Sequence, residues 1–140
     1  MRRRHLLGAV AATATGLAAP ALRAQAWPAK PIRILIPFAP GGTSDILARL
    51  LQPYLQSALG QSVVVENRTG ANGNIAVDMV AKSPPDGYTL VLPDLGNLTI
   101  SPSVMKLPFD VAKDFNAVTV LAYSPHLLAV NPDRPYKTVA

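Results

Sequence analysis

The sequence contains no cysteine among its 140 residues. This absence excludes disulfide bridges, thiolate metal ligands and a cysteine nucleophile, so stability must come from an apolar core. Histidine is also scarce, because His5 and His126 are the only two. A catalytic or metal-binding cluster of several histidines is therefore excluded, and a Ser-His-Asp triad is disfavoured.

Without its first 26 residues, the chain has no large excess of positive or negative charge. The whole chain has 13 Lys+Arg and 8 Asp+Glu, hence a net charge of +5. Four of the basic residues, Arg2, Arg3, Arg4 and Arg23, lie in the first 26 residues, so the remainder carries 9 basic and 8 acidic residues. No basic stripe with interleaved aromatic residues is left, which disfavours nucleic-acid binding.

The first 26 residues have the pattern of an export signal. A basic start, Arg2–His5, precedes an apolar stretch without acids, Leu6–Leu22, and Ala24–Ala26 fits the A-x-A cleavage motif. The stretch is rich in small residues and interrupted by Pro20, which disfavours a membrane-spanning helix. The sequence predicts export with cleavage after Ala26. General secretory export and twin-arginine export both stay open, since Arg3-Arg4 permits the second route.

The 114 residues that follow Ala26 alternate between strand-like and helix-like segments. Hydrophobic patterning predicts strands at Ile32–Ile36, Val63–Val65 and Tyr88–Leu92, and helices at Ile46–Leu59 and Asn74–Ala81. Pro53 predicts a kink or early break in the first helix, and Gly60 predicts its end. This alternation is typical of the α/β class, with a parallel sheet covered by helices on both faces.

The segment PFAPGGTSD, Pro37–Asp45, connects the first predicted strand to the first predicted helix. Its glycine pair, Gly41-Gly42, permits a tight turn, and Thr43-Ser44-Asp45 offers N-cap side chains. A helix N-terminus presents backbone N–H groups and a partial positive charge, which favour a carboxylate or phosphate. An ordinary capped turn without a ligand is the alternative. The segment lacks the lysine of a phosphate-binding P-loop.

Three loops follow the predicted strands, and we expect them to meet at one edge of the sheet. They are residues 37–42, Arg68–Asn74 and Asp94–Thr99. Ligands of parallel sheets lie beyond the carboxyl ends of the strands, so this edge is the predicted site. Asp94 is predicted to cap a turn or helix, with a role in ligand recognition as the alternative.

The region after Leu107 has a different pattern. Leu107–Phe115 is predicted as an irregular loop, followed by strand-like runs at Ala117–Tyr123 and Leu127–Val130. Lys137–Ala140 has the pattern of a helix start, with Thr138 as a possible N-cap. We therefore expect the sequence to be an N-terminal fragment of a larger domain.

Several stretches resemble, in order and spacing, the substrate-binding proteins of tripartite tricarboxylate transporters, the Bug (TctC-like) family. They are WPAKPIRILIPFAPGGTSDILARLL, LGQSVVVENRTGANGNIAVDMVAKSPPDGYTL, LPFDVAKDF and LLAVNP. The resemblance runs from Trp27 to Ala140. It implies a periplasmic solute-binding protein of the two-lobed, hinged type II fold, which closes around a small carboxylate and delivers it to a membrane permease.

The resemblance also implies a division of the chain and a set of site residues. Residues 1–26 would be the signal, 27–115 the first lobe, and 116–140 an incomplete crossover into the second lobe. The implied ligand-binding residues are Phe38, Ala39, Gly41, Gly42, Thr43, Ser44, Gly73 and Asn97. The resemblance implies no catalytic residue, no metal, no cofactor and no nucleic-acid partner, and a monomer at full length.

Two positions depart from the family pattern. Ser101-Pro102 stands where Asn-Pro is frequent, and Asp94 stands where a small neutral residue is common. An acid at this place would repel a second carboxylate of the solute, or would recognise an ammonium or amide group. The identity of the solute stays open. An exported hydrolase using Asp45 or Asp94, and an accessory protein that presents its ligand to a membrane sensor, are the alternative functions.

Overall fold

The computed structural model describes residues 26–125, 127–135 and 138. The predicted export signal and most of the predicted helix start at 137–140 lie outside these residues. The elements in chain order are β1 Ile32–Ile36, α1 Thr43–Leu59, β2 Val63–Asn67, the 3-10 turn η1 Ala71–Gly73, α2 Asn74–Ala81, β3 Thr89–Val91, the π-helical turn η2 Gly96–Ile100, and α3 Ser101–Val104. None of the helices in the described ranges is long and apolar enough to cross a membrane.

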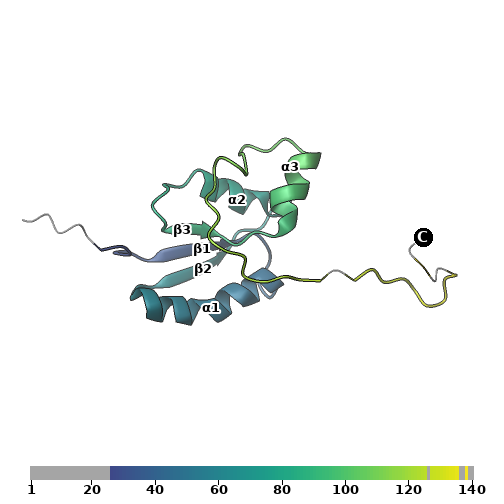
Figure 1. Ribbon diagram of the computed structural model, residues 1–140, viewed down its shortest axis with the longest axis horizontal. Helices are drawn as coiled ribbons and strands as arrows, with labels where there is room; N and C mark the ends of the chain where they lie inside the picture. Colours follow the sequence, from purple (N-terminus) through teal and green to yellow (C-terminus); the bar gives the residue numbers. More distant parts are fainter. Residues whose placement is uncertain (1–25, 126, 136–137, 139–140) are drawn as a thin grey trace, which may run out of the picture.

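The three strands form one parallel sheet in the order β2-β1-β3. Ile34 in the central strand lies opposite Val65 on one side and Leu90 on the other. Figure 1 shows α1 against one face of this sheet, with α2 and α3 on the other. The predicted α/β class and the parallel sheet are confirmed.

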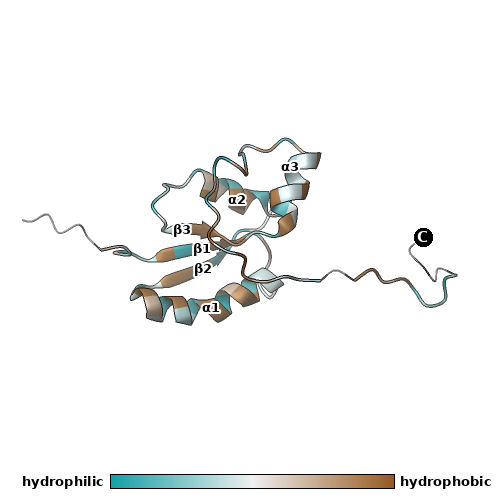
Figure 2. Ribbon diagram, viewed as in Figure 1, coloured by the Kyte–Doolittle hydropathy of each residue, from teal (hydrophilic) through white to brown (hydrophobic). Residues whose placement is uncertain are grey.

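The hydrophobic core lies between the sheet and α1. Alternate residues of β1 point toward this helix, and successive side chains of a strand face opposite sides. The buried cluster consists of Ile32, Ile34, Ile36, Ala48 and Val63, with Leu55, Leu59, Val65, Tyr88, Leu90 and Leu92 packed against it. On the opposite face, Leu35 and Val77 of α2 are fully buried. In Figure 2 the strands are mostly apolar, with hydrophilic positions within β1 and at the end of β2.

Coverage of the second face is less complete than the sequence predicts. The helix α2 packs against β1 and β3, and Val64 on β2 is 39% exposed. Ion pairs occupy the remaining surface, where Glu66 Oε1 accepts from Arg33 Nε at 2.8 Å and Glu66 Oε2 from Arg68 Nη2 at 3.0 Å. A short helix cannot span three strands, so charged side chains cover the edge strand instead.

Pro53 does not break α1, which continues without interruption to Leu59. Of the two predicted effects of Pro53, the early break is wrong and the kink stays a prediction. Pro53 lies on the exposed side of the helix, where water can hydrate the carbonyl that loses its partner. Gly60 ends the helix as predicted, with φ +64° and its N–H donating to the carbonyl of Gln56 at 3.0 Å.

Element boundaries differ from the predictions mainly beside loops. The helix α1 begins at Thr43, three residues before the predicted start, and its N-cap is Gly42 without a side-chain cap bond. The predicted N-cap role of residues 43–45 is therefore wrong. The strand β2 is longer than predicted and β3 shorter, whereas β1 and α2 have the predicted bounds. The helical segment 96–104 overlaps the loop predicted at Asp94–Thr99, and no element was predicted for residues 100–104. Gly96 and Thr99 are poor helix formers, so local propensity does not indicate this helix.

Beyond α3 the chain is irregular. Residues 107–115 form the predicted loop, in which the rings of Phe109 and Phe115 meet edge to face at 5.8 Å. Residues 116–125 and 127–135 contain no strand and extend away from the sheet, as Figure 1 shows. The predicted strands at 117–123 and 127–130 are wrong for this structure, since a strand needs a neighbour for its backbone hydrogen bonds. The proposed division into lobes stays a prediction.

Candidate functional site

Three loops meet at the carboxyl edge of the sheet, as the sequence predicts. Asn67 Nδ2, at the end of β2, donates to the carbonyl of Phe38 at 3.0 Å. Ser44 Oγ, in the first turn of α1, donates to Asp94 Oδ1 at 3.0 Å. These contacts bring the loop after β1 together with the ends of β2 and β3.

The N-terminus of α1 presents unpartnered backbone donors at this edge. The first hydrogen bond of the helix runs from the N–H of Ile46 to the carbonyl of Gly42 at 3.0 Å. None of the residues that the structure describes accepts from the N–H groups of Thr43, Ser44 and Asp45. Such donors, together with the helix dipole, favour an anion.

The two glycines before α1 have different conformations. Gly41 has φ +85°, a left-handed conformation, and its N–H donates to Asp45 Oδ2 at 2.9 Å. Gly42 has φ −73°, which any residue can adopt. A Cβ on Gly42 would meet only the carbonyl oxygen of Ala39, at 3.4 Å. The turn therefore requires a glycine at 41, whereas Gly42 leaves the space in front of the helix open.

Asp45 anchors this loop rather than facing a solute. Its side chain is almost fully buried, and Oδ1 accepts from Arg49 Nε and from Asn67 Nδ2, both at 3.0 Å. Arg49 Nη2 also donates to Asn67 Oδ1 at 3.1 Å. The hydrogen bonds from Arg49, from the N–H of Gly41 and from Asn67 lower the pKa of Asp45 from 3.8 to about 2. A carboxyl group held in this way is unsuited to donate a proton.

Gly73 and Asn97, both predicted site residues, lie in direct contact behind the loop. Gly73 has φ +86°, and a Cβ there would come within 2.7 Å of Pro37 Cβ and 3.0 Å of Asn97 Nδ2. Asn97 is 1% exposed. Its Nδ2 donates to the carbonyl of Asn72 at 2.7 Å, and its Oδ1 accepts from the N–H of Asp94 at 3.2 Å. Its polar atoms are thus engaged in holding the loops together, a role that the sequence analysis missed.

The predicted residues are brought together, but in two layers. Gly42 and Thr43 are exposed at the edge, and Phe38 is half-buried. Ser44, Gly73 and Asn97 are buried behind them. Asp45 and Asn67 were not among the predicted ligand-binding residues, although Asp45 was a candidate N-cap and a candidate acid of the alternative hydrolase. The sequence signal for Asn67 is its position just after a predicted strand. A direct contact of any of these residues with a solute stays a prediction.

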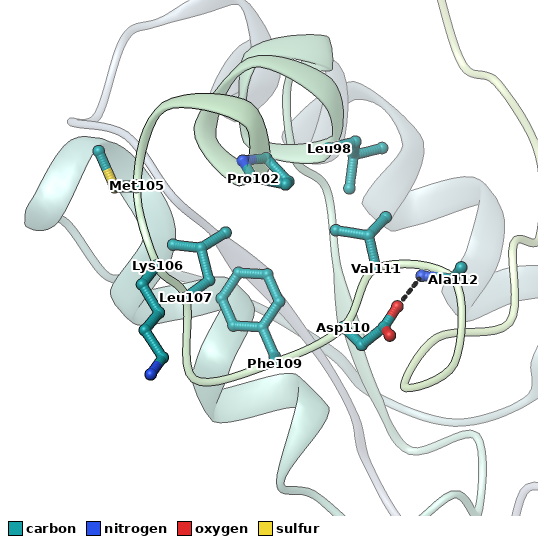
Figure 3. A pocket seen from close by; sticks show the side chains of 9 residues that line it. All are labelled: Leu98, Pro102, Met105, Lys106, Leu107, Phe109, Asp110, Val111 and Ala112. Atoms are coloured by element: carbon teal, nitrogen blue, oxygen red, sulfur yellow. Dashed lines mark hydrogen bonds between the residues drawn. The ribbon is translucent and has the colours of Figure 1, made fainter.

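A separate hollow lies away from this edge of the sheet. A cavity of about 380 Å³ opens beneath the loop after α3, and Figure 3 shows the Phe109 side chain and its neighbours around it. It is lined by Leu98, Pro102, Met105, Lys106, Leu107, Phe109, Asp110, Val111 and Ala112. No group of His, Asp and Glu side chains within the described ranges is arranged to hold a metal ion.

Residues 47–140 match the family described as "Tripartite tricarboxylate transporter family receptor", TctC. The chain belongs to this family. It is 44% identical over 132 residues to protein BugT of Bordetella pertussis, covering 91% of this chain and 39% of that protein. It is 34% identical over 137 residues to the UPF0065 protein in the tcbD-tcbE intergenic region of Pseudomonas sp., covering 98% and 41%. The TctC-family chain thus spans about two fifths of the length of these curated relatives.

Solved structures agree with this assignment. MatC from Rhodopseudomonas palustris, with bound malate, is 37% identical with a TM-score of 0.64, covering 67% of this chain and 32% of that one. A structure of a periplasmic transporter is 43% identical with a TM-score of 0.60, covering 63% and 30%. The predicted family and the predicted periplasmic-binding-protein-like fold are confirmed.

Proposed function

We propose that this TctC-family chain supplies the carboxylate-binding edge of a periplasmic solute receptor. The receptor would serve a tripartite tricarboxylate transporter and hand its solute to the membrane permease. The observation that carries the proposal is the set of N–H groups of Thr43, Ser44 and Asp45, which have no acceptor among the described residues. They lie where three loops meet, at the edge where α/β proteins bind their ligands.

The chemistry of this edge suits binding better than catalysis. A small carboxylate can approach the helix N-terminus closely, because Gly42 has no side chain and is exposed. Asp45, the acid nearest to the helix start, is fully engaged as an acceptor by Arg49, Asn67 and Gly41. A hydrolase based on Asp45 would need this carboxyl group as a proton donor or nucleophile, and its three partners leave it unsuited to either role. The malate bound to MatC, a relative of similar fold, is a carboxylate of the proposed class.

A graft tests the proposal. Residues 27–115 of this chain replace the matching segment of BugT, and isothermal titration calorimetry is run with malate, succinate and citrate. The neutral diamide of succinate serves as the control ligand. We expect saturable binding of at least one of the three acids, no binding of the diamide, and no turnover of matching esters. Binding of none of the acids by a folded graft, or hydrolysis of the esters, would contradict the proposal.

A further inference from the structure

Asp94 places a carboxylate beside the unpartnered donors of α1. It follows β3, is exposed, and its Oδ1 accepts from Ser44 Oγ at 3.0 Å. Because Ser44 contributes both this hydroxyl and one of the unpartnered N–H groups, the acid and the donors share one small region. The N–H of Asp94 donates to the buried side chain of Asn97 at 3.2 Å, which fixes the loop that carries the acid.

Asp94 differs from most acids of this chain in having no basic partner. All eight Asp and Glu residues lie in the described ranges, and five of them form ion pairs: Asp45, Glu66, Asp78, Asp86 and Asp110. No lysine or arginine of those ranges pairs with Asp94, and none of their donors reaches its Oδ2. One oxygen of the carboxylate is therefore available to a solute.

We propose that the solute of this receptor is a short amino carboxylate, whose carboxylate binds the N–H groups at the start of α1 and whose ammonium group binds Asp94. This inference rests on the proposed function. By standard bond lengths, Asp94 Oδ1 lies within roughly 6 Å of the Ser44 nitrogen, since both are linked through Ser44 Oγ. Asp94 Oδ2 belongs to the same carboxylate, so a short solute, with one to three carbon atoms between its carboxylate and its ammonium group, is long enough to reach both.

Charge explains why the ammonium group would be selected. A hydrogen bond between an ammonium and a carboxylate is charge-assisted and stronger than a neutral one. A second carboxylate of the solute at this place would face Asp94 and be repelled, so malate and succinate should bind, but more weakly than an amino carboxylate of similar length. The Ser44 hydroxyl offers no substitute donor, because its proton is already directed to Asp94.

Matched pairs of probes test this inference in the BugT graft. Glycine, β-alanine and 4-aminobutyrate are compared by calorimetry with acetate, propionate and butyrate, which lack only the ammonium group. We expect at least one of these amino acids to bind tighter, by about tenfold or more, than the matched acid that lacks the ammonium group. One charge-assisted hydrogen bond implies a difference of this size. In Asp94→Asn this preference falls to about threefold or less. Asp114→Asn removes an exposed acid that lies within the grafted residues but outside the three loops of the site, and it should keep the preference.

Each outcome decides between the two proposals. If succinate or malate binds but the ammonium group confers no preference, or if Asp94→Asn keeps the preference, the inference fails and the proposed function stands. If no carboxylate of any kind binds, both fail. Amide NMR shifts of Thr43, Ser44 and Asp94 in the 140-residue chain give a second measurement, which detects millimolar binding of β-alanine and propionate. If β-alanine and propionate cause equal amide shifts at Thr43, Ser44 and Asp94, the inference is likewise overturned.

Discussion

Asn97 Nδ2 donates a 2.7 Å hydrogen bond to the backbone carbonyl of Asn72, which joins the loop after β3 to the loop after β2. The same side chain lies 3.3 Å from Asn74 Oδ1 and accepts from the N–H of Asp94. The geometry of the site edge therefore depends on a buried amide whose polar atoms are engaged within the protein.

Replacing Asn97 by alanine should destabilise the protein by about 1–3 kcal/mol, because the carbonyl of Asn72, the buried side chain of Asn74 and the N–H of Asp94 lose their partner. Urea unfolding followed by circular dichroism measures the change. Thr99→Ala is the matched control, since its hydroxyl bonds the carbonyl of Leu95 on an exposed surface, and it should cost less than about 0.5 kcal/mol. Equal losses in both variants would contradict the structural role of Asn97.

Two glycine-to-alanine variants should have opposite effects on stability. Gly73→Ala puts a Cβ within 2.7 Å of Pro37 Cβ at a φ of +86°, so it should cost about 1–3 kcal/mol. Gly96→Ala adds a Cβ with nothing within 4 Å in a helical segment, and it should stabilise by about 0.5–1 kcal/mol. Thermal unfolding of the two variants side by side provides the measurement. A stable Gly73→Ala protein would show that the contact between these loops is looser than described.

The elements that depend on local pattern could be predicted from the sequence. The strand β1 is apolar except for Arg33 and rich in isoleucine, and α2 follows a glycine turn, so both were predicted with their observed bounds. Pro53 misled the prediction because its cost depends on whether the freed carbonyl of Arg49 can reach water, which is a property of the packed molecule. Residues 117–123 have strand propensity, but propensity alone does not supply a neighbouring strand.

The candidate site could also be predicted only in part from the sequence. That its loops meet follows from the rule for parallel sheets and needs no tertiary knowledge. The role of Asp45 could not be predicted, because its partner Asn67 lies 22 positions further along the chain. The separate roles of the two glycines could not be predicted either. The pair Gly41-Gly42 predicts a turn, but only the backbone angles of the structure assign the left-handed conformation to Gly41 and not to Gly42.

Acid should destabilise this chain through two carboxyl groups. The pKa of Asp45 falls from 3.8 to about 2, chiefly through Arg49, and that of Glu66 falls from 4.5 to about 2, chiefly through Arg33. Both are lowered in the folded state, so their contribution is complete above the unfolded pKa and is lost as pH falls toward 2. We expect the melting temperature to be nearly constant from pH 7 to 5 and to fall between about pH 4.5 and 2.

The variants Asp45→Asn and Glu66→Gln test the assignment. Each should lower stability at pH 7 and flatten the fall below pH 4.5, because one of the two groups no longer takes up a proton. Asp133→Asn, which removes an exposed acid, should leave the profile unchanged. If the melting temperature of both test variants falls with pH as steeply as that of the parent protein, groups other than Asp45 and Glu66 cause the fall.

The last prediction separates anion binding from simple capping at the start of α1. Gly42→Val should fold, because φ −73° suits valine and only the Ala39 carbonyl lies within 4 Å, at 3.4 Å. Its branched side chain would stand in front of the N–H groups of Thr43 and Ser44, so affinity for malate or succinate should fall about tenfold or more. Thr43→Ala keeps its backbone N–H and should cost at most about 0.5–1.5 kcal/mol of binding free energy.

Gly41→Val is the contrasting variant. Its φ of +85° is strained for any side chain, so stability should fall by about 1–2 kcal/mol. The variants Gly42→Val, Thr43→Ala and Gly41→Val are compared in the BugT graft. Calorimetry measures their affinity for the carboxylate, and thermal unfolding measures their stability. If Gly42→Val binds carboxylates as well as the parent graft does, the helix start is an ordinary turn without a ligand. If Gly42→Val instead loses affinity at unchanged melting temperature, capping alone cannot account for it, because a capping defect acts on stability and leaves the binding surface intact.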